Sequence, residues 1–186
     1  MSKSKQEFEQ RILPHLGAAY SLARWLLRHP QDAEDAVQEA VLKAFKAFHG
    51  YEGGSAQAWL LTIVRNTCLT AIGRRRTVGK VIVLQDVVDE RDKNRIDALP
   101  DMQPLPDVRL MQAEDRRRVH AAVAALPEQF REVLVLREFH DLNYREIADI
   151  VGAPVGTVMS RLSRAREKLK EVLVASGDAA ETGKVK

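Results

Sequence analysis

Hydroxyl and guanidinium side chains recur at short intervals in residues 155–168, and together they could bind DNA. Arginine can donate two hydrogen bonds to a guanine edge or to a phosphate, and serine and threonine hydroxyls can add shorter contacts. The candidate DNA contacts are Thr157, Ser160, Arg161, Arg164 and Lys168. The same residues also suit a solvated basic face on an ordinary helix, so the elements that position them decide between the two interpretations.

The sequence around these side chains predicts a helix-turn-helix. Residues 144–151 are typical of a short helix, Gly152 of a tight turn, and Pro154 of a first helical turn. In the second helix, apolar residues at helical spacing predict a buried face. They are Val158, Leu162, Ala165, Leu169 and Val172. The candidate contacts then point outward or to the flank, as in a helix that enters a major groove, and residues 155–157 are expected to offer free amides to a phosphate.

A second polar pattern occupies residues 32–39, which contain four acids and no base. Acids at a helix start are favoured by the helix dipole, which explains Asp32, an N-cap or first-turn acid, and Glu34. Four other residues share one face because they lie at i, i+3, i+4 and i+7. They are Asp35, Gln38, Glu39 and Leu42. This face suits either docking of a basic helix of another protein or simple solvation.

A third pattern joins a loop of small residues at 50–57 to a helix that ends in arginines. The loop is flanked by aromatic residues and could admit an unstacked base, although such aromatics more often belong to a core. The helix could follow a nucleic-acid backbone, although cations at a helix end are also favoured by the dipole. The candidate contacts are Tyr51, Ser55, Arg65, Asn66, Arg74, Arg75 and Arg76.

Bulk properties narrow the class of protein. The 186 residues are 45% hydrophobic and 30% charged, with a net charge of +3. Cys68 is the single cysteine, so no internal disulfide is possible, and its apolar surroundings predict a buried thiol. Charges interrupt every apolar run, so we expect a cytoplasmic protein without membrane insertion. The sequence has no metal-spaced cluster, phosphate loop or nucleophile setting, so we expect neither an enzyme nor a cofactor.

Composition and periodicity predict an all-α fold of two small helical domains joined by a flexible Pro-rich linker. The domains are expected at 5–76 and 113–175, with the linker at 77–112 and a disordered tail at 176–186. Pro14 is expected at a helix start or kink, and Ser55 at a helix N-cap. One predicted apolar stripe comprises Val37, Ala40, Val41, Ala44, Phe45 and Phe48.

Four motifs in this order resemble the extracytoplasmic-function (ECF) group of bacterial RNA polymerase sigma factors, over about residues 6–173. They are DAEDAVQEA at 32–40, AWLLTIVRN at 58–66, LPEQFR at 126–131, and YREIA at 144–148 with PVGTV at 154–158 and SRLSRAR at 160–166. The Pro-rich linker lies between the second and the third.

This resemblance implies two sigma domains, a helical bundle called region 2 and a helix-turn-helix called region 4. The face of Asp35, Gln38 and Glu39 would dock the β′ coiled coil. The loop with Arg65 and Asn66 would open the −10 element, and the helix from residue 155 would read the −35 element. The implied partners are core RNA polymerase, through its β′ and β subunits, promoter DNA, and an anti-sigma factor.

The main alternative is a stand-alone helix-turn-helix regulator. The acidic face and the basic helix before the linker argue against it, because a simple regulator needs neither. The chain departs from its relatives at Thr70, where many carry Asp, and at Met159 and Ser163, where long basic or aromatic residues are common. The promoter sequence that this chain recognises therefore cannot be taken from that of any relative.

Overall fold

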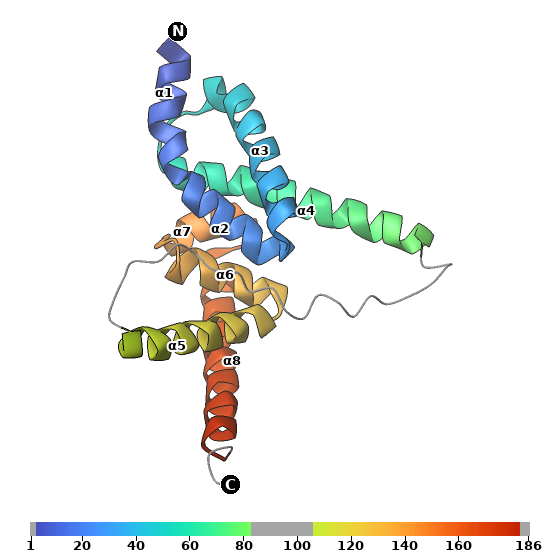
Figure 1. Cartoon of the computed structure of the whole chain (residues 1–186). Coiled ribbons are helices and arrows are strands. Elements are labelled where there is room, and N and C mark those ends of the chain that lie inside the picture. The colour runs from blue at the N-terminus through green and yellow to red at the C-terminus, as the bar shows by residue number, and fades with distance from the viewer. Residues whose placement is uncertain (1–2, 83–105, 183–186) are drawn as a thin grey trace.

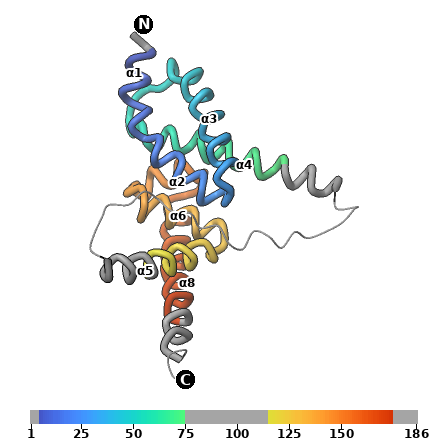
Figure 2. Tube along the Cα trace, viewed as in Figure 1, coloured from blue at the N-terminus to red at the C-terminus, as the bar shows by residue number. Residues whose placement is uncertain are grey.

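We describe a computed structural model, which covers residues 3–82 and 106–182, with side chains described for residues 5–74 and 115–174. Every regular element within these ranges is helical, which confirms the predicted all-α fold. The helices form an N-terminal and a C-terminal group that pack against each other, with α2 lying on α6 (Figures 1 and 2).

The N-terminal group begins with two helices separated by a short 3-10 segment. Its elements are α1 (Lys3–Ile12), η1 (Leu13–His15), α2 (Leu16–Leu27), α3 (Pro30–Ala47), η2 (Phe48–Gly50) and α4 (Ala56–Ile82). Pro14 lies in η1, two residues before α2 begins, in agreement with its predicted place near a helix start. Arg28 ends α2 in the left-handed conformation, with φ of 62°, and Pro30 starts α3 two residues later.

The buried face of α3 consists of alanines. They are Ala33, Ala36, Ala40 and Ala44, which are at most 5% exposed. The predicted stripe was therefore partly wrong, because Val37 and Val41 are only partly buried and Phe45 is 43% exposed. Small side chains let α3 approach α2 and α4 closely, and the larger residues are left to flank the contact.

The C-terminal group is built around one central helix. Its elements are α5 (Pro106–Ala125), α6 (Glu128–Glu138), α7 (Tyr144–Val151) and α8 (Val155–Thr182). All side chains of α6 from Phe130 to Leu136 are buried. A helix buried all round must be covered on several sides, and α2, α7 and α8 all pack on it.

The helices extend beyond the predicted boundaries. α4 continues to Ile82 and α5 starts at Pro106, both inside the segment predicted as a linker, whose residues 83–105 lie outside the described ranges. The tail predicted to be disordered is helical to Thr182. Residues such as alanine and glutamate favour this outcome, because adding a residue to an existing helix avoids the cost of nucleation.

The buried apolar residues form one cluster that continues from the N-terminal group into the C-terminal group. Cys68 belongs to it and is fully buried, as predicted. Burial raises the pKa of its thiol to about 12, so this cysteine stays protonated and unreactive at neutral pH.

Candidate nucleic-acid and partner interfaces

The helix-turn-helix is fixed at both ends of its first helix. The Asn143 side chain accepts hydrogen bonds of 3.0 Å from the amides of Arg145 and Glu146, and the Glu146 carboxylate accepts one of 2.9 Å from the Asn143 amide. This capping box satisfies the first amides of α7. Gly152 ends α7 with φ of 64°, a conformation that favours glycine. The angle at which α8 leaves α7 is therefore set locally.

The candidate DNA contacts of α8 lie on its outer side. Ser160, Arg164 and Lys168 are exposed, whereas Thr157 and Arg161 are half-buried. The opposite face is buried at Val158, Leu162 and Ala165, as predicted, whereas Leu169 and Val172 further along the same face are only half-buried. The predicted row of free amides at 155–157 was wrong at Thr157, because its amide donates to the carbonyl of Pro154 at 2.9 Å.

Two arginines two residues apart on α8 have different surroundings. Arg166 donates to the Glu138 carboxylate of α6 at 2.7 Å, so it joins two helices of the C-terminal group. Arg164 has no hydrogen-bond or ion-pair partner within the described part of the chain. Only Arg164 is therefore available for an external acceptor without first breaking an internal pair.

The acidic face of α3 is open to solvent. Asp35, Gln38 and Glu39 are exposed, and Leu42 is 63% exposed. Such an exposed leucine beside charged groups is suited to contact with another protein.

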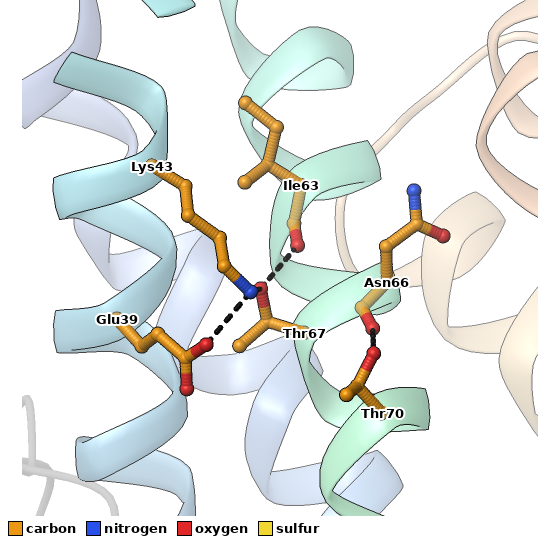
Figure 3. A network of polar contacts seen from close by, with 6 residues as sticks. All are labelled: Glu39, Lys43, Ile63, Asn66, Thr67 and Thr70. Carbon is orange, nitrogen blue, oxygen red and sulfur yellow. Dashed lines mark hydrogen bonds and ion pairs between the residues drawn. The ribbon is translucent and has the colours of Figure 1, made fainter. Parts of the chain in front are cut away.

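A lysine next to this face connects it to α4. Lys43 pairs with the Glu39 carboxylate at 2.7 Å and donates to the Thr67 hydroxyl of α4 at 3.2 Å, as Figure 3 shows. The Lys43 hydrogen bond and charge lower the pKa of Glu39, and the charge of Arg74 adds to this effect. Glu39 is thus kept ionised and its side chain is held in place.

The loop before α4 is held by a tyrosine and two glycines. The Tyr51 hydroxyl donates to the carbonyl of Gly54 at 2.8 Å, and Gly53 and Gly54 have φ of 100° and 90°. The Tyr51 ring lies 5.0 Å from that of Trp59. The Ser55 hydroxyl accepts from the amide of Ala58 at 3.2 Å, so its predicted N-cap is confirmed.

The two described arginines of α4, Arg65 and Arg74, have different surroundings. Asn66 and Arg74 are exposed, and the Thr70 hydroxyl donates to the Asn66 carbonyl at 2.8 Å (Figure 3). Arg65 points instead toward α6, where its Nε lies 2.5 Å from the Glu132 carboxylate. The side chains of Arg75 and Arg76 lie outside the described ones.

Further contacts join the two groups of helices. Trp25 of α2 stacks on His120 of α5, with ring centroids 4.2 Å apart. Arg28 donates to the carbonyl of Ala124 at 2.9 Å, and Gln57 donates to the carbonyl of His140 at 3.2 Å.

Sequence reasoning missed Lys43 and Glu132, which hold two of the candidate site residues. The i+4 spacing of Glu39 and Lys43 is a visible signal for an ion pair. Glu132 has no such signal, because Arg65 lies 67 positions before it.

The described residues contain neither a metal-binding cluster nor a helix that could span a membrane. No group of three or more His, Cys, Asp and Glu side chains there is arranged to hold a metal ion. None of the described helices is long and apolar enough to cross a bilayer.

Comparison with protein families gives two matches in chain order. Residues 12–78 match the model of sigma-70 region 2, and residues 116–169 match that of sigma-70 region 4. The chain is 35% identical to RNA polymerase sigma-H factor of Pseudomonas aeruginosa over 91% of this chain and 87% of that protein. It is 38% identical to the ECF RNA polymerase sigma-E factor of Escherichia coli K12, over 74% of this chain and 72% of that protein.

Solved structures show the same arrangement of helices. The sigma factor RpoE of Bartonella quintana, in complex with the anti-sigma factor NepR, matches with a TM-score of 0.73 and 27% identity over 90% of this chain and 97% of that chain. CnrH in complex with the cytosolic domain of CnrY has a TM-score of 0.62 at 23% identity over 92% of this chain and 90% of that chain, which supports the fold alone.

Proposed function

The chain belongs to the ECF family of RNA polymerase sigma factors, and on that premise we propose that three of its surfaces divide the work of promoter recognition. As an alternative sigma factor it directs promoter-specific initiation of transcription and has no catalytic activity of its own. The proposed division assigns α3 to the polymerase, α4 and its loop to the −10 element, and α8 to the −35 element. The proposed domain boundaries remain 5–76 and 113–175.

We assign −35 recognition to the outer face of α8. Arg164 carries this assignment, because it is exposed, has no partner among the described residues, and lies on a helix whose other face is packed in the core. Arg161, Ser160, Thr157 and Lys168 share this side of α8 and would add base or phosphate contacts.

We assign recognition of the −10 element to the loop at residues 50–57 and to α4. The aromatic ring of Tyr51 would stack on an unpaired base, and Ser55 and Asn66 would add hydrogen bonds. Arg65 and the cluster 74–76 would bind the backbone phosphates.

We assign core polymerase binding to α3. The exposed Asp35, Gln38 and Glu39 share a helix face with Leu42, which is 63% exposed, and this combination suits a basic, partly apolar helix such as the β′ coiled coil. Contact with the β subunit would come from other parts of the chain. Because polymerase and promoter DNA are cytoplasmic in bacteria, we also place the protein there. An anti-sigma factor is a further proposed partner, and the Bartonella relative is seen with one.

Run-off transcription tests this function. Purified core polymerase is given the full-length chain and DNA fragments, beginning with the fragment upstream of the gene that encodes it. We expect transcripts of defined length that require both the chain and core polymerase. Binding of the chain alone to an operator as a dimer, without any stimulated transcription, would instead identify a stand-alone regulator.

A further inference from the structure

Two exposed apolar residues lie among the proposed DNA contacts of α8. Met159 is 53% exposed and Val155 is 38% exposed, although both side chains are apolar. They are four positions apart, so their side chains lie one above the other on the same side of the helix. Single exposed apolar residues are common on protein surfaces, but a neighbouring pair at the start of a proposed DNA-reading helix points to a contact outside the chain.

Met159 belongs to the surface assigned to the −35 element. It follows the buried Val158 and precedes the exposed Ser160, so at about 100° per residue it lies at the edge of the outer face. A methyl group added at Gly156 would meet no neighbouring side chain or helix within 4 Å, so the first turn of α8 is open here. The N-terminal residues of a recognition helix are those that reach base edges in the major groove. Met159 therefore lies where a base edge is expected.

The hydroxyl groups beside Met159 are bonded within their own helix. Ser160 Oγ donates to the carbonyl of Thr157 at 3.0 Å, and Ser163 Oγ donates to the Glu167 carboxylate at 3.3 Å. In this arrangement both hydroxyls offer only lone pairs to an outside group. The contact that the Met159 side chain itself makes thus gains weight in discriminating between bases.

Among the groups that distinguish the base pairs in the major groove, the C5-methyl of thymine is the apolar one. The others are hydrogen-bond donors and acceptors. A thioether packed against such a polar group would remove it from water without giving it a strong hydrogen bond, whereas packing against the methyl buries apolar surface on both sides. Methionine suits this contact, because its unbranched chain has three rotatable bonds and adapts to the shape that it meets.

We propose that Met159 selects a thymine in the −35 element by packing against its C5-methyl group, with Val155 shielding the contact from water. The inference rests on the proposed function, because it takes α8 to enter the major groove at the −35 element. It adds a specificity-determining residue to the polar contacts of α8. Arg164 would supply hydrogen bonds, and Met159 a preference that depends on apolar contact alone.

Replacing thymine by deoxyuridine tests this contact. The probe is a promoter fragment identified by run-off transcription, in which each thymine of the −35 segment, on either strand, is replaced in turn. The replacement removes only the methyl group and keeps every hydrogen-bonding group of the base. We expect one replacement to weaken binding by the holoenzyme about fourfold, the value for burial of one such carbon group. With Met159→Ala in the holoenzyme, the same replacement should have no such effect.

Val174→Ala is the matched control for Met159→Ala. Val174 is apolar and 56% exposed, but it lies about 22 Å further along α8, at 1.5 Å per residue. The Val174→Ala holoenzyme should keep the full penalty for deoxyuridine. Met159→Leu should keep most of the penalty, because its side chain is still apolar, and Met159→Gln should lose it. A penalty that persists in Met159→Ala, or disappears in Val174→Ala, would overturn the proposal.

A methyl group placed on another base provides the converse test. At the position found above, the T·A pair is exchanged for C·G with either cytosine or 5-methylcytosine, whose methyl occupies the same place in the groove. We expect the wild-type holoenzyme to bind the 5-methylcytosine fragment about fourfold more tightly than the cytosine fragment. The Met159→Ala holoenzyme should bind the two equally. Equal binding by the wild type would show that the methyl group is not recognised, and the proposal would be wrong.

The two proposals fail in different ways. If Arg164→Ala and every deoxyuridine replacement leave promoter binding unchanged, α8 does not read the −35 element, and the proposed function fails at this surface. If Arg164→Ala weakens promoter binding while no replacement depends on Met159, the function stands and the thymine contact is wrong. Met159→Ala that weakens binding of an anti-sigma factor, with an unchanged response to deoxyuridine, would assign the apolar pair to a protein partner and also overturn the inference.

Discussion

Arg164 on α8 and Arg65 on α4 are the same chemical group, proposed for the same kind of ligand, in opposite situations. Arg164 is exposed and has no acceptor in the part of the chain that the structure describes, whereas Arg65 is 17% exposed and held by Glu132. The difference comes from the neighbouring helix rather than from the arginine. α8 turns one face to solvent, whereas α4 is covered by α7 and faces α6 through Arg65. A binding residue is thus made available, or withheld, by what packs beside it.

The largest expected effect concerns α3, whose acidic face is exposed and should behave as an open surface. Reversing two charges, Asp35→Arg with Glu39→Arg, should weaken core polymerase binding at least about a hundredfold, about 3 kcal/mol, within the range for close interfacial charge pairs. Co-elution and titration with labelled core polymerase measure this, and circular dichroism should show unchanged helicity.

Its control is Glu7→Arg with Glu171→Arg, an equal change of charge at exposed positions of α1 and α8. Full binding by the α3 variant would contradict the docking assignment. Equal loss in the control would show that only net charge matters.

The next prediction compares two arginines of α8, Arg164 and Arg166. Arg164→Ala should weaken promoter binding by the holoenzyme by roughly 1–3 kcal/mol, the range for a bidentate base contact. Arg166→Ala is the matched control, because it removes the same group from a residue already paired with Glu138, and it should change affinity little. Filter binding on promoter and scrambled DNA separates two roles. A uniform loss on both would identify Arg164 as a phosphate contact.

The N-caps of α7 and α4 should also differ in how much they stabilise the fold. Asn143 accepts two amide hydrogen bonds within a capping box, whereas Ser55 accepts one at 3.2 Å. Asn143→Ala should therefore lower the free energy of unfolding by about 1 kcal/mol, and Ser55→Ala by less. Urea unfolding followed by circular dichroism provides the values. A larger loss at Ser55 would mean that the loop before α4 depends on its cap more than the geometry indicates.

The smallest expected effect is that of pH on the stability of the fold at His120. Burial lowers the pKa of His120, and the nearby charge of Arg24 lowers it further. In the unfolded state this pKa returns to about 6.5, so the folded state binds fewer protons. The contribution of His120 to the free energy of unfolding should be fully present above pH 7 and fall as the pH falls toward 5. Urea unfolding at pH 7.5 and 5.5 measures it.

The variant His120→Phe keeps a ring against Trp25 without a titrating group, so its pH dependence should shrink. It should not vanish, because burial also lowers the pKa of His140, whose carbonyl accepts from Gln57. An unchanged pH dependence in His120→Phe would show that His120 does not cause it.

Sequence periodicity predicted what depends on neighbours along the chain. The buried face of α8, the cap at Ser55 and the helix start that follows Pro14 are all set by residues a few positions apart. The failures have a different origin. The exposure of Phe45 depends on how closely alanines let three helices approach, and the partner of Arg65 lies 67 residues away. A local sequence pattern reveals neither how closely helices approach nor which residues far apart in the sequence become partners.

The alanine face of α3 has a consequence for genetics. Ala33, Ala40 and Ala44 are fully buried, so the backbone of α3 rests almost directly on its neighbours. A valine at any of these positions would need space that the core does not have, and α3 would be pushed outward with its whole acidic face. A screen for mutants that lose polymerase binding should thus recover hidden alanines, whose side chains never touch the polymerase, alongside the surface charges.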